Sequence, residues 1–475
     1  MEQIVNKSLL NATCDANDDA IAVINPATEQ VVAYIPSISS SEILKLVEKS
    51  KQAQKLWQQK TAAERSKVLE TWYQLMMDNA DDLARIMTLE QGKPLAESKG
   101  EVNYGASFLK WFAEEGKRTY GEVIPEPASS KRIMTIRQPV GVAAAITPWN
   151  FPIAMITRKA APALAAGCSF MVKPANQTPL SAYATAELAY QAGLPRDLLI
   201  VVNNHSSVAV GDIFCTHDDI KKLSFTGSTE VGRHLIKQSA ETIKRTSMEL
   251  GGNAPFIVFD DANIDDAVEG AIASKFRNAG QTCVCANRFY VQDAVYDEFV
   301  EKFTQAVAKL KVGDGLEEGV TIGPLVDSRA KESVMGYIST AIEQGAKVAM
   351  GGQGLDGLFV EPTVLTDVTQ DMDIVQTELF GPVAPIVRFS DDQELVEKAN
   401  DTIYGLASYF YTGSIPRAFH IAEQLEYGMV GINEGLISTE VAPFGGVKQS
   451  GFGREGAKQG IDEYLNIKYM CFGGL

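Results

Sequence analysis

Histidine is scarce in this sequence of 475 residues, which contains only His205, His217, His234 and His420. None of them has a zinc-like spacing with the cysteines, so we expect no metal site. Cysteine is also uncommon, and six residues are too few for a disulfide scaffold: Cys14, Cys168, Cys215, Cys283, Cys285 and Cys471. This usage predicts a reducing, cytoplasmic setting.

Long apolar runs are lacking as well. No stretch of 18 apolar residues occurs, and residues 1–11 are polar, so we expect neither a membrane span nor a signal peptide. Lys and Arg number 43 against 60 Asp and Glu, which gives a net charge of -17. This balance argues against nucleic acid or an anionic membrane as a partner, and an anionic substrate would need locally placed Arg or Lys. The length predicts two or three domains.

From residue 140 onward, short apolar strands alternate with helices, as in a parallel, doubly wound α/β sheet that binds a nucleotide at its carboxyl edge. A second α/β series runs from Phe256 to about Asn433. The predicted strands of the first series are Val140–Ile146, Ser169–Lys173, Leu198–Val202 and Lys222–Phe225. Its predicted helices are Ile153–Ala166, Leu180–Ala192 and Thr229–Ser239.

The N-terminal part differs in pattern. Ile21–Ile35 predicts two short strands, and Ser39–Glu42 predicts the cap of a helix that runs to about Trp57. Apolar residues at three- and four-residue spacing then predict long helices over Ala62–Leu89 and Glu97–Lys117.

Two segments favour an arm outside the main body. Gly121–Gln138 is rich in Pro, Ser and β-forming residues and contains a possible hairpin strand, Lys131–Arg137. The tail Glu463–Cys471 has strand character. We expect this tail to pair with the excursion or with a neighbouring subunit.

The glycine motifs differ in value. Gly352–Gly357 and Gly451–Gly456 fit G-x-G-x-x-G, but neither lies between a strand and a helix, so we expect loops. Gly227 and Ser228 do lie between a predicted strand and a predicted helix. Helix N-terminal amides bind phosphate, and these residues are therefore candidate contacts for a pyrophosphate. A capped helix without a ligand fits them equally well.

The stretch from Arg277 to Arg288 places two thiols, Cys283 and Cys285, just after a predicted helix over Ala267–Ala279. Gly280 breaks that helix and brings Cys283 into a tight loop. A thiolate is a strong nucleophile, and a shielded loop suits covalent catalysis.

Two polar residues elsewhere have both an ordinary and a catalytic interpretation. Glu249, just before two glycines, is either a surface charge or a general base for water. Asn150, at the end of a predicted strand, is either a helix-cap residue or a donor to a developing oxyanion.

Taken together, seven segments resemble the NAD(P)-dependent aldehyde dehydrogenase family over Ile21–Leu475. They are Pro148–Pro152, Lys173–Ala175, Phe225–Ser228, Glu249–Gly252, Gly280–Cys283, Glu378–Pro382 and Pro443–Gly446. The resemblance implies a Rossmann-like cofactor domain (1–120 and 140–251), an α/β catalytic domain (252–451) and a small β oligomerisation arm (121–139 and 452–475). It also implies a homodimer or homotetramer.

The resemblance implies that Cys283 is the nucleophile, Glu249 the base and Asn150 the oxyanion donor. It implies that Lys173 contacts the adenosine ribose, Ser228 the pyrophosphate and Glu378 the nicotinamide ribose. The full set of implied cofactor contacts is Thr147, Pro148, Trp149, Lys173, Asn176, Thr226, Gly227, Ser228, Leu250, Glu378 and Phe380.

Asn176 departs from the pattern of many NAD-preferring relatives, which have a glutamate there that binds the ribose 2′-OH. Loss of that carboxylate removes repulsion of a 2′-phosphate, and Lys173 offers a cation. We therefore expect NADP as the preferred cofactor, with NAD possible.

The run Thr282–Cys285 resembles the succinate-semialdehyde dehydrogenases within the family. Arg158, Arg277 and Ser438 align with residues that bind the substrate carboxylate there, and Arg suits a carboxylate because it binds with two hydrogen bonds. We expect oxidation of succinate semialdehyde to succinate. The alternative is another carboxylated aldehyde, such as glutarate semialdehyde.

Cys285 is either a small packing residue or the partner of Cys283 in a reversible redox switch. Other classes fit less well. A cysteine hydrolase needs a histidine partner, and none lies in the matching segments. A non-catalytic relative would be expected to lose Cys283 or Glu249, and a coenzyme-A-acylating one has no need of Glu249 to activate water.

Overall fold

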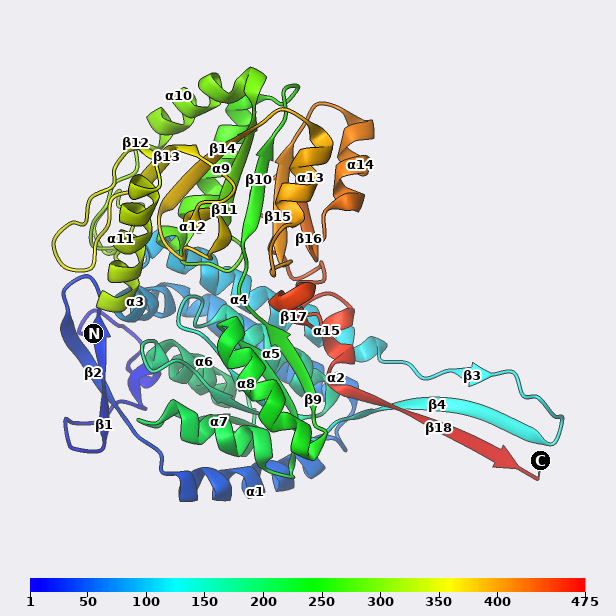
Figure 1. Ribbon diagram of the computed structural model, residues 1–475. Helices are drawn as coiled ribbons and strands as arrows, with labels where there is room; N and C mark the ends of the chain where they lie inside the picture. Colours follow the sequence, from blue (N-terminus) through cyan, green and yellow to red (C-terminus); the bar gives the residue numbers. More distant parts are fainter. Residues whose placement is uncertain (475) are drawn as a thin grey trace.

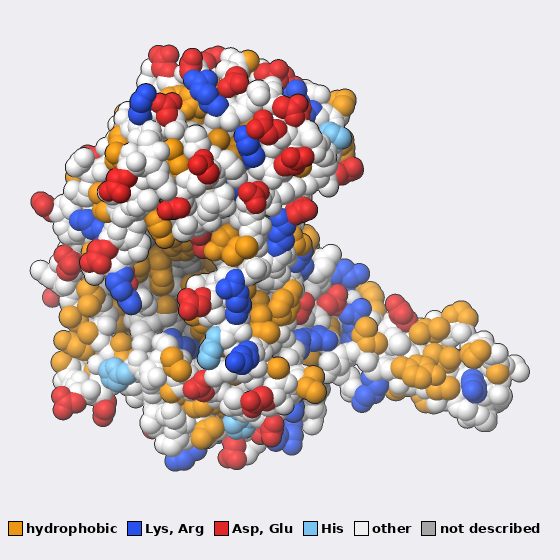
Figure 2. Space-filling model, viewed as in Figure 1, with side chains coloured by type: hydrophobic (Ala, Val, Ile, Leu, Met, Phe, Trp, Pro, Cys, Tyr) orange, Lys and Arg blue, Asp and Glu red, His pale blue; other side chains and the backbone are white. Residues whose placement is uncertain are grey.

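The computed structural model describes residues 1–474, which form two α/β bodies and a projecting β arm (Figure 1). The chain passes between the bodies in the short connection 250–253, and the surface is hollowed between them (Figure 2). Within the described range, no helix has the length and apolar character needed to cross a membrane.

The first body is built on a six-stranded sheet in the order β17-β9-β8-β5-β6-β7. Strands β5 to β9 run parallel, and β17 pairs antiparallel with β9. The strands are β5 (Val142–Ile146), β6 (Ser169–Lys173), β7 (Leu199–Val201), β8 (Ile220–Thr226), β9 (Arg245–Glu249) and β17 (Gly451–Phe452). The chain order reverses between β5 and β8, and a doubly wound sheet binds ligands at the carboxyl ends of the strands at such a point.

Three of the four helices between these strands were predicted, and their ends lie within one residue of the predicted ones; the helix Ser207–Thr216 was not predicted. The four helices are α5 (Ala154–Ala166), α6 (Pro179–Gln191), α7 (Ser207–Thr216) and α8 (Thr229–Ser239). The predicted bounds of α8 are confirmed to the residue because Ser228 caps it, its Oγ accepting from the Val231 N–H at 3.4 Å.

Four helices precede this sheet in the chain: α1 (Ser40–Trp57), α2 (Ala62–Asp78), α3 (Ala80–Gln91) and α4 (Leu95–Glu115). The capping box of Ser39 and Glu42 is confirmed. The single helix predicted over Ala62–Leu89 is wrong, because the chain breaks at Asn79. The Asn79 side chain donates to the Leu75 carbonyl at 2.8 Å and ends α2 there.

The second body contains a seven-stranded sheet in the order β12-β13-β14-β11-β10-β15-β16, in which only β12 runs antiparallel to its neighbour. The strands are β10 (Ala254–Val258), β11 (Ala286–Gln292), β12 (Lys347–Met350), β13 (Thr363–Val368), β14 (Val383–Phe389), β15 (Ala407–Tyr411) and β16 (Met429–Ile432). The helices of this body are α9 (Ile264–Phe276), α10 (Tyr296–Val307), α11 (Ser328–Glu343), α12 (Asp373–Gln376), α13 (Asp392–Asn400) and α14 (Ile415–Gln424). The last helix, α15 (Gln459–Asp462), packs beside α5 of the first body.

Each body has its own apolar core. In the second, Phe256 of β10 packs on Phe289 of β11, with ring centroids 5.2 Å apart. In the first, the indoles of Trp57 and Trp72 are buried and donate to backbone carbonyls. Burial of one large apolar side chain contributes about 1.5–3 kcal/mol, so each core stabilises its own sheet.

The arm is a three-stranded sheet of β3 (Val123–Ile124), β4 (Lys131–Pro139) and β18 (Leu465–Gly473). β18 pairs antiparallel with β4 from Leu465 opposite Pro139 to Gly473 opposite Lys131, which confirms the predicted pairing of the tail with the excursion. The arm extends away from both bodies and carries exposed hydrophobic side chains (Figures 1 and 2).

The remaining elements are short. A separate antiparallel pair consists of β1 (Ala20–Asn25) and β2 (Gln30–Pro36), as predicted. Short 3-10 helices occur at Lys7–Leu10, Gly116–Arg118, Arg196–Leu198, Ala240–Thr242, Arg277–Gly280, Asp293–Val295 and Lys448–Ser450.

Of the two glycine motifs predicted to be loops, Gly352–Gly357 is confirmed. The other, Gly451–Gly456, begins with the two residues of β17, because the N–H of Leu250 binds the Ser450 carbonyl at 2.9 Å and brings this segment alongside β9.

Candidate active site

The loop that carries Cys283 begins with three consecutive residues in the left-handed region. Asn278, Ala279 and Gly280 have φ of 51°, 54° and 75°. A Cβ on Gly280 would lie 2.1 Å from the carbonyl oxygen of Gly381, so only glycine fits. The predicted end of the helix at Ala279 is therefore three residues too late, since α9 ends at Phe276.

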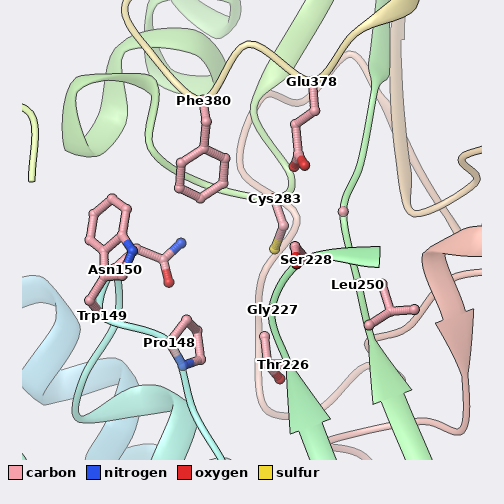
Figure 3. Close-up of a pocket in the computed structure, with 11 residues that line it drawn as sticks. Pro148, Trp149, Asn150, Thr226, Gly227, Ser228, Leu250, Cys283, Glu378 and Phe380 are labelled. Atoms are coloured by element: carbon pink, nitrogen blue, oxygen red, sulfur yellow. The ribbon is translucent and has the colours of Figure 1, made fainter. Parts of the chain in front are cut away.

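A cavity of about 240 Å³ lies at the junction of the two bodies, in front of Cys283 (Figure 3). Its walls come from the segments after β5, β8 and β9, the Cys283 loop, and the segment after α12. The lining residues are Pro148, Trp149, Asn150, Thr226, Gly227, Ser228, Leu250, Gly251, Cys283, Glu378 and Phe380. The fold thus brings together most of the residues expected from the sequence.

Asn150 is buried and linked directly to the Cys283 loop. Its Nδ2 donates to the carbonyl of Gln281, two residues before Cys283, at 2.9 Å. A primary amide has two N–H groups, so one remains available to an oxygen in the cavity. Its own Oδ1 has no hydrogen-bond partner.

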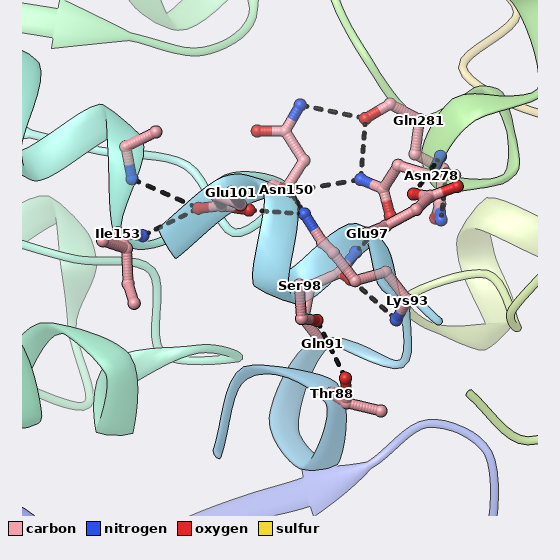
Figure 4. A network of polar contacts seen from close by, with 11 residues as sticks. Thr88, Gln91, Lys93, Glu97, Ser98, Glu101, Asn150, Ile153, Asn278 and Gln281 are labelled. Atoms are coloured by element: carbon pink, nitrogen blue, oxygen red, sulfur yellow. Dashed lines mark hydrogen bonds and ion pairs between the residues drawn. The ribbon is translucent and has the colours of Figure 1, made fainter. Parts of the chain in front are cut away.

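A buried polar network holds the backbone on both sides of this contact (Figure 4). Lys93 Nζ donates to the Asn150 carbonyl and pairs with Glu101, both at 2.6 Å. Glu101 also accepts from the N–H of Ile153 at 2.9 Å. Glu97 accepts from the N–H of Asn278 at 2.8 Å.

Sequence reasoning missed this network. Its acids and lysine lie on α4 and the turn before it, and none of them was singled out as a site residue.

Glu249 is the last residue of β9 and is only 2% exposed. Neither of its carboxylate oxygens has a hydrogen-bond partner within the described residues. Burial, and then the neighbouring Glu455, raise the pKa of Glu249 well above its usual range, against the opposing effect of Arg158 and Lys159. A buried carboxyl group whose pKa is raised suits general base catalysis.

Glu455 was not singled out from the sequence. Arg158 and Lys159 of α5 both form buried ion pairs with it. Burial alone would raise the pKa of Glu455, but the two cations outweigh burial and hold that pKa below its usual range. The signal in the sequence was two adjacent cations in an otherwise apolar helix, which require a buried acid nearby.

Cys283 itself is half-buried. Burial raises its pKa to about 12, and Arg158 opposes that effect. The thiol is therefore protonated near neutral pH in the coenzyme-free protein. Cys285 is buried, its Sγ accepting from Thr282 Oγ1 at 3.3 Å and donating to the Lys275 carbonyl at 3.4 Å.

Glu378 lies above the thiol and fits closely against the connection between the bodies. It accepts from the N–H of Gly252 at 3.0 Å, and its second oxygen lies 2.6 Å from where a Cβ on Gly251 would be. Burial raises the pKa of Glu378 to about 7. Phe380 packs edge-on against Trp149, with centroids 5.7 Å apart.

Lys173 and Asn176 lie outside this cavity. Lys173 lines a second cavity, of about 590 Å³ between α7 and α8, and Asn176 a third, of about 540 Å³; Ser207 lines both. Burial lowers the pKa of Lys173 to about 8, and its Nζ donates only to the Pro174 carbonyl. Thr147 is buried, and its N–H donates to the Lys173 carbonyl.

These features fit a dinucleotide. Ribose and phosphate groups are suited by three features. Lys173 is buried and has no acid partner among the described residues, α8 starts at Ser228 beside the cavity, and Gly227 lies at the switch point of the sheet. The Gly227 position has no room for a Cβ, which would lie 2.5 Å from Phe225, so the backbone there stays open to a close ligand.

The arginines expected to bind a carboxylate flank one small apolar cluster. The Arg277 guanidinium lies 4.8 Å from the centre of the Phe151 ring, and Arg158 Nη2 lies 3.1 Å from the sulfur of Met155. Phe151 and Met155 pack in the same cluster. Arg277 is half-buried, and no acid forms an ion pair with it within residues 1–474. Ser438 is half-buried in the segment after β16 and lines none of the three cavities.

Comparison with known proteins follows this geometry. A model described as the aldehyde dehydrogenase family matches residues 13–470. The chain is 56% identical to the succinate-semialdehyde dehydrogenase [NADP(+)] GabD of Escherichia coli K12, covering 99% of this chain and 98% of that protein. It is 58% identical to the glutarate-semialdehyde dehydrogenase of Pseudomonas putida KT2440, covering 96% and 95%.

A solved structure agrees with the fold. The crystal structure of succinate-semialdehyde dehydrogenase from Burkholderia pseudomallei has a TM-score of 0.97 and 53% sequence identity, and the match covers 99% of this chain and all of that one. Within residues 1–474, no three His, Cys, Asp or Glu side chains are grouped in a way that could hold a metal ion.

Proposed function

Because this chain belongs to the aldehyde dehydrogenase family and has its α/β fold, we propose that it oxidises succinate semialdehyde to succinate with NADP⁺ or NAD⁺. The observation that carries the proposal is the convergence of Cys283, Asn150 and Glu378 on one cavity between the two sheets. The named activity of the Escherichia coli relative gives the substrate and the preference for NADP⁺.

Cys283 is the proposed nucleophile. The thiol first gives up its proton to water. The thiolate then attacks the aldehyde carbon, and the resulting oxyanion accepts from the free N–H of Asn150 and from the backbone N–H of Cys283. Loss of hydride leaves a thioester on Cys283. When bound, NAD(P)⁺ supplies the hydride acceptor and a positive charge near the thiol.

Glu249 is the proposed base for hydrolysis. It takes a proton from water, which attacks the thioester and releases the acid. Support comes from its unpaired, buried carboxylate and from its position at the end of β9, one residue before the cavity wall at Leu250. Arg158, Lys159 and Glu455 set the charge around it.

The cofactor contacts expected from the sequence remain proposals. Glu378 and Phe380 suit the nicotinamide end, since both line the Cys283 cavity. Ser228 and Gly227 suit the pyrophosphate at the start of α8. Lys173 and Asn176 suit the adenosine ribose, because they lie at the carboxyl end of β6, the strand beside β5.

For the substrate carboxylate, Arg277 is the better supported clamp. It is half-buried, has no acid partner within residues 1–474, and lies against Phe151, next to Asn150. Arg158 already pairs with Glu455, so it contributes charge while sharing its guanidinium. Ser438 is proposed as a further contact on the strength of the sequence pattern alone.

A second candidate substrate is glutarate semialdehyde, which the Pseudomonas putida relative is named for. It differs by one methylene between the aldehyde and the carboxylate. One methylene in a pocket changes specificity by about 10–200-fold. A clamp at a fixed distance from Cys283 should therefore prefer one of the two lengths.

A substrate panel at fixed NADP⁺ tests both proposals. We expect the highest kcat/KM for succinate semialdehyde, a lower value for glutarate semialdehyde, and a much lower value for butanal, which has no carboxylate. Equal values for butanal and the two acids would contradict the carboxylate clamp. A higher value for glutarate semialdehyde would favour the second candidate.

We also propose a cytoplasmic homodimer or homotetramer, with domains at 1–120 and 140–251, 252–451, and an arm at 121–139 and 452–475. The arm supports this, because Val123, Ile467 and Tyr469 are exposed on a sheet that packs on neither body. Sedimentation of the chain with and without residues 465–475 tests it. If the shortened chain formed an oligomer with the same number of subunits as the full chain, the proposal that the arm joins the subunits would be contradicted.

A further inference from the structure

Three asparagines meet where β6 and β7 end. Asn203 Nδ2 donates to Asn176 Oδ1 at 2.9 Å and lies 3.4 Å from the Pro174 carbonyl. Asn176 Nδ2 donates to the backbone carbonyl of Asn204 at 3.0 Å. The backbone itself is anchored to the start of α1, since the N–H of Ile38 binds the Asn203 carbonyl at 2.8 Å.

Two backbone carbonyls determine which way both amides point. A carbonyl oxygen only accepts, so the Pro174 carbonyl requires the nitrogen of Asn203 on its side. The Asn204 carbonyl likewise requires the nitrogen of Asn176. If either side chain were flipped, two oxygens would face each other. The orientation therefore follows from the surrounding backbone.

This arrangement leaves Asn176 with a free N–H. Its carbonyl oxygen already accepts one hydrogen bond from Asn203, while the second N–H of its Nδ2 remains available. A ribose 2′-OH is best bound by an acceptor, whereas a 2′-phosphate needs donors. The fixed amide therefore suits the phosphate, and its oxygen, which already accepts one hydrogen bond, is a poorer acceptor for the hydroxyl.

Asn203 is fully buried, and its Oδ1 has no hydrogen-bond partner within residues 1–474. A buried polar atom without a partner costs about 1–3 kcal/mol, which offsets part of what the two Nδ2 contacts contribute. An apolar replacement removes that unpaired oxygen but leaves the Asn176 oxygen and the Pro174 carbonyl without their donor. Asn176 would then be held by the Asn204 carbonyl alone.

Some of the charges near Asn176 suit a phosphate. Lys173 is the last residue of β6, three residues before Asn176, and has no acid partner among the described residues, and Ser206 caps the ten-residue helix α7 nearby. Three acids, Glu29, Glu90 and Asp327, also line the Asn176 cavity. Burial raises the pKa of Glu90 to about 8, so it is largely uncharged at neutral pH. Glu29 is exposed, so water and salt screen its charge, and Asp327 pairs with Arg329 at 3.6 Å.

We propose that Asn203 is a positioning residue for coenzyme choice: by holding the Asn176 carbonyl, it turns the N–H of Asn176 toward the 2′-phosphate of NADP⁺. The inference rests on the proposed function, because it takes the ribose to lie at the ends of β6 and β7. Asn203 itself touches neither coenzyme.

The test is equilibrium binding without aldehyde. The dissociation constants of NADP⁺ and NAD⁺ are measured by titration calorimetry for the parent and for Asn203→Val. We expect the preference for NADP⁺ to fall by roughly fivefold, the effect of about one hydrogen bond, and NAD⁺ to bind more tightly as the Asn176 carbonyl becomes free. The melting temperature of the variant should change only modestly, because the loss of the two Nδ2 contacts is offset in part by the loss of an unpaired buried oxygen.

Asn204→Ala is the matched control. It removes a neighbouring amide that supports the same loop through Ile38 and Ser206, but it keeps the backbone carbonyl that binds Asn176. We expect its coenzyme preference to equal that of the parent. If Asn203→Val does not fold, Asn203→Ala removes the donor with a smaller side chain and should give the same shift.

An unchanged ratio of the two dissociation constants in a folded Asn203 variant would overturn the proposal, and so would an equal shift in Asn204→Ala. Failure of the proposed function would be seen elsewhere, as normal coenzyme binding without oxidation of any acid aldehyde in the panel. The two failures are therefore distinguishable.

Discussion

The side-chain amide of Asn150 donates to the carbonyl of Gln281 at 2.9 Å, so the first body reaches across and binds the loop that carries Cys283. Asn150 follows β5 of one sheet, and Gln281 precedes β11 of the other. One N–H of the amide links the two bodies, and the other is available to the oxyanion in the mechanism that we propose.

Replacement of Asn150 by alanine should reduce kcat by about 10²–10³, the usual effect of losing one oxyanion donor. Steady-state kinetics with succinate semialdehyde measure it. Binding of NADP⁺ should change little, because Ser228 and Lys173 do not contact Asn150. If the coenzyme dissociation constant rose as much as kcat fell, Asn150 would be a structural residue instead of an oxyanion donor.

Replacement of Arg277 by methionine should raise KM for succinate semialdehyde by about 10–100-fold, since a hydrogen bond to a charged group contributes about 1.5–3 kcal/mol. Butanal is the internal control, because it offers no carboxylate and its kcat/KM should be unaffected. Arg158→Met should lower both kcat and stability, because it leaves Glu455 with one cation fewer. Equal losses for both aldehydes in Arg277→Met would contradict the clamp.

Replacement of Glu249 by glutamine should slow steady-state turnover by about 10²–10⁴ while a first burst of NADPH persists, because hydride loss precedes hydrolysis. The pKa of Glu249 is raised by burial, so its base form appears only as pH rises through that raised value. The parent should therefore show rising kcat with pH, and the variant should lose this limb. Loss of the burst itself would contradict the assignment.

Glu90 predicts a pH dependence of stability. It accepts from the N–H groups of Leu180 and Ser181 at the start of α6, and burial raises its pKa to about 8. The folded state binds its proton more tightly than the unfolded state, where the pKa is about 4.3. The resulting stability is present in full below the unfolded pKa and is lost as pH rises toward 8.

Glu90→Gln should accordingly flatten the decline of the free energy of unfolding between pH 5 and pH 8, a slope of at most about 1.4 kcal/mol per pH unit. Denaturant titrations at a series of pH values measure this. Glu48→Gln, an exposed change on α1, should retain the parent slope. An identical slope in all three proteins would contradict the titration of Glu90.

For Cys285 the redox switch remains a prediction. Peroxide should oxidise the half-buried Cys283 first, and Cys285 should then attack the sulfenic acid and form a disulfide. In the parent protein, dithiothreitol should reduce this disulfide and restore activity. In Cys285→Ala the sulfenic acid of Cys283 has no neighbouring thiol to trap it, so excess peroxide should oxidise it further to the sulfinic acid, which dithiothreitol does not reduce. Equal recovery of both proteins would refute the switch.

Much of the first body was predictable because its local signals agree. Ser228 caps α8, the Ser39 capping box starts α1, and short apolar strands alternate with these helices. The break at Asn79 was not predictable, because the apolar spacing continues across it and no glycine or proline marks it. The end of α9 was missed for a related reason, since Asn278 and Ala279 adopt left-handed conformations that favour glycine.

The candidate site divides in the same way. Residues in recognisable motifs, such as Cys283 and Glu378, were expected, and the fold brings them to one cavity. Glu455 was missed because its partner Lys159 lies 296 residues away in the chain. The Lys93–Glu101 pair was missed because the Asn150 carbonyl that Lys93 binds lies 57 residues away, and no local pattern relates them. Such long-range polar contacts depend on the packing of whole elements, which a single sequence does not determine by local pattern.

The two glycines after Glu249 allow the two bodies to lie close together at their connection. A Cβ on Gly252 would lie 2.2 Å from the Cys283 carbonyl, and one on Gly251 would press on Glu378. Any larger side chain at either position would wedge the sheets apart and carry the thiol away from Asn150. The relative position of the two bodies thus depends on the absence of side chains at Gly251 and Gly252. A substitution as small as Gly252→Ala should displace Cys283 from Asn150 although neither residue is changed.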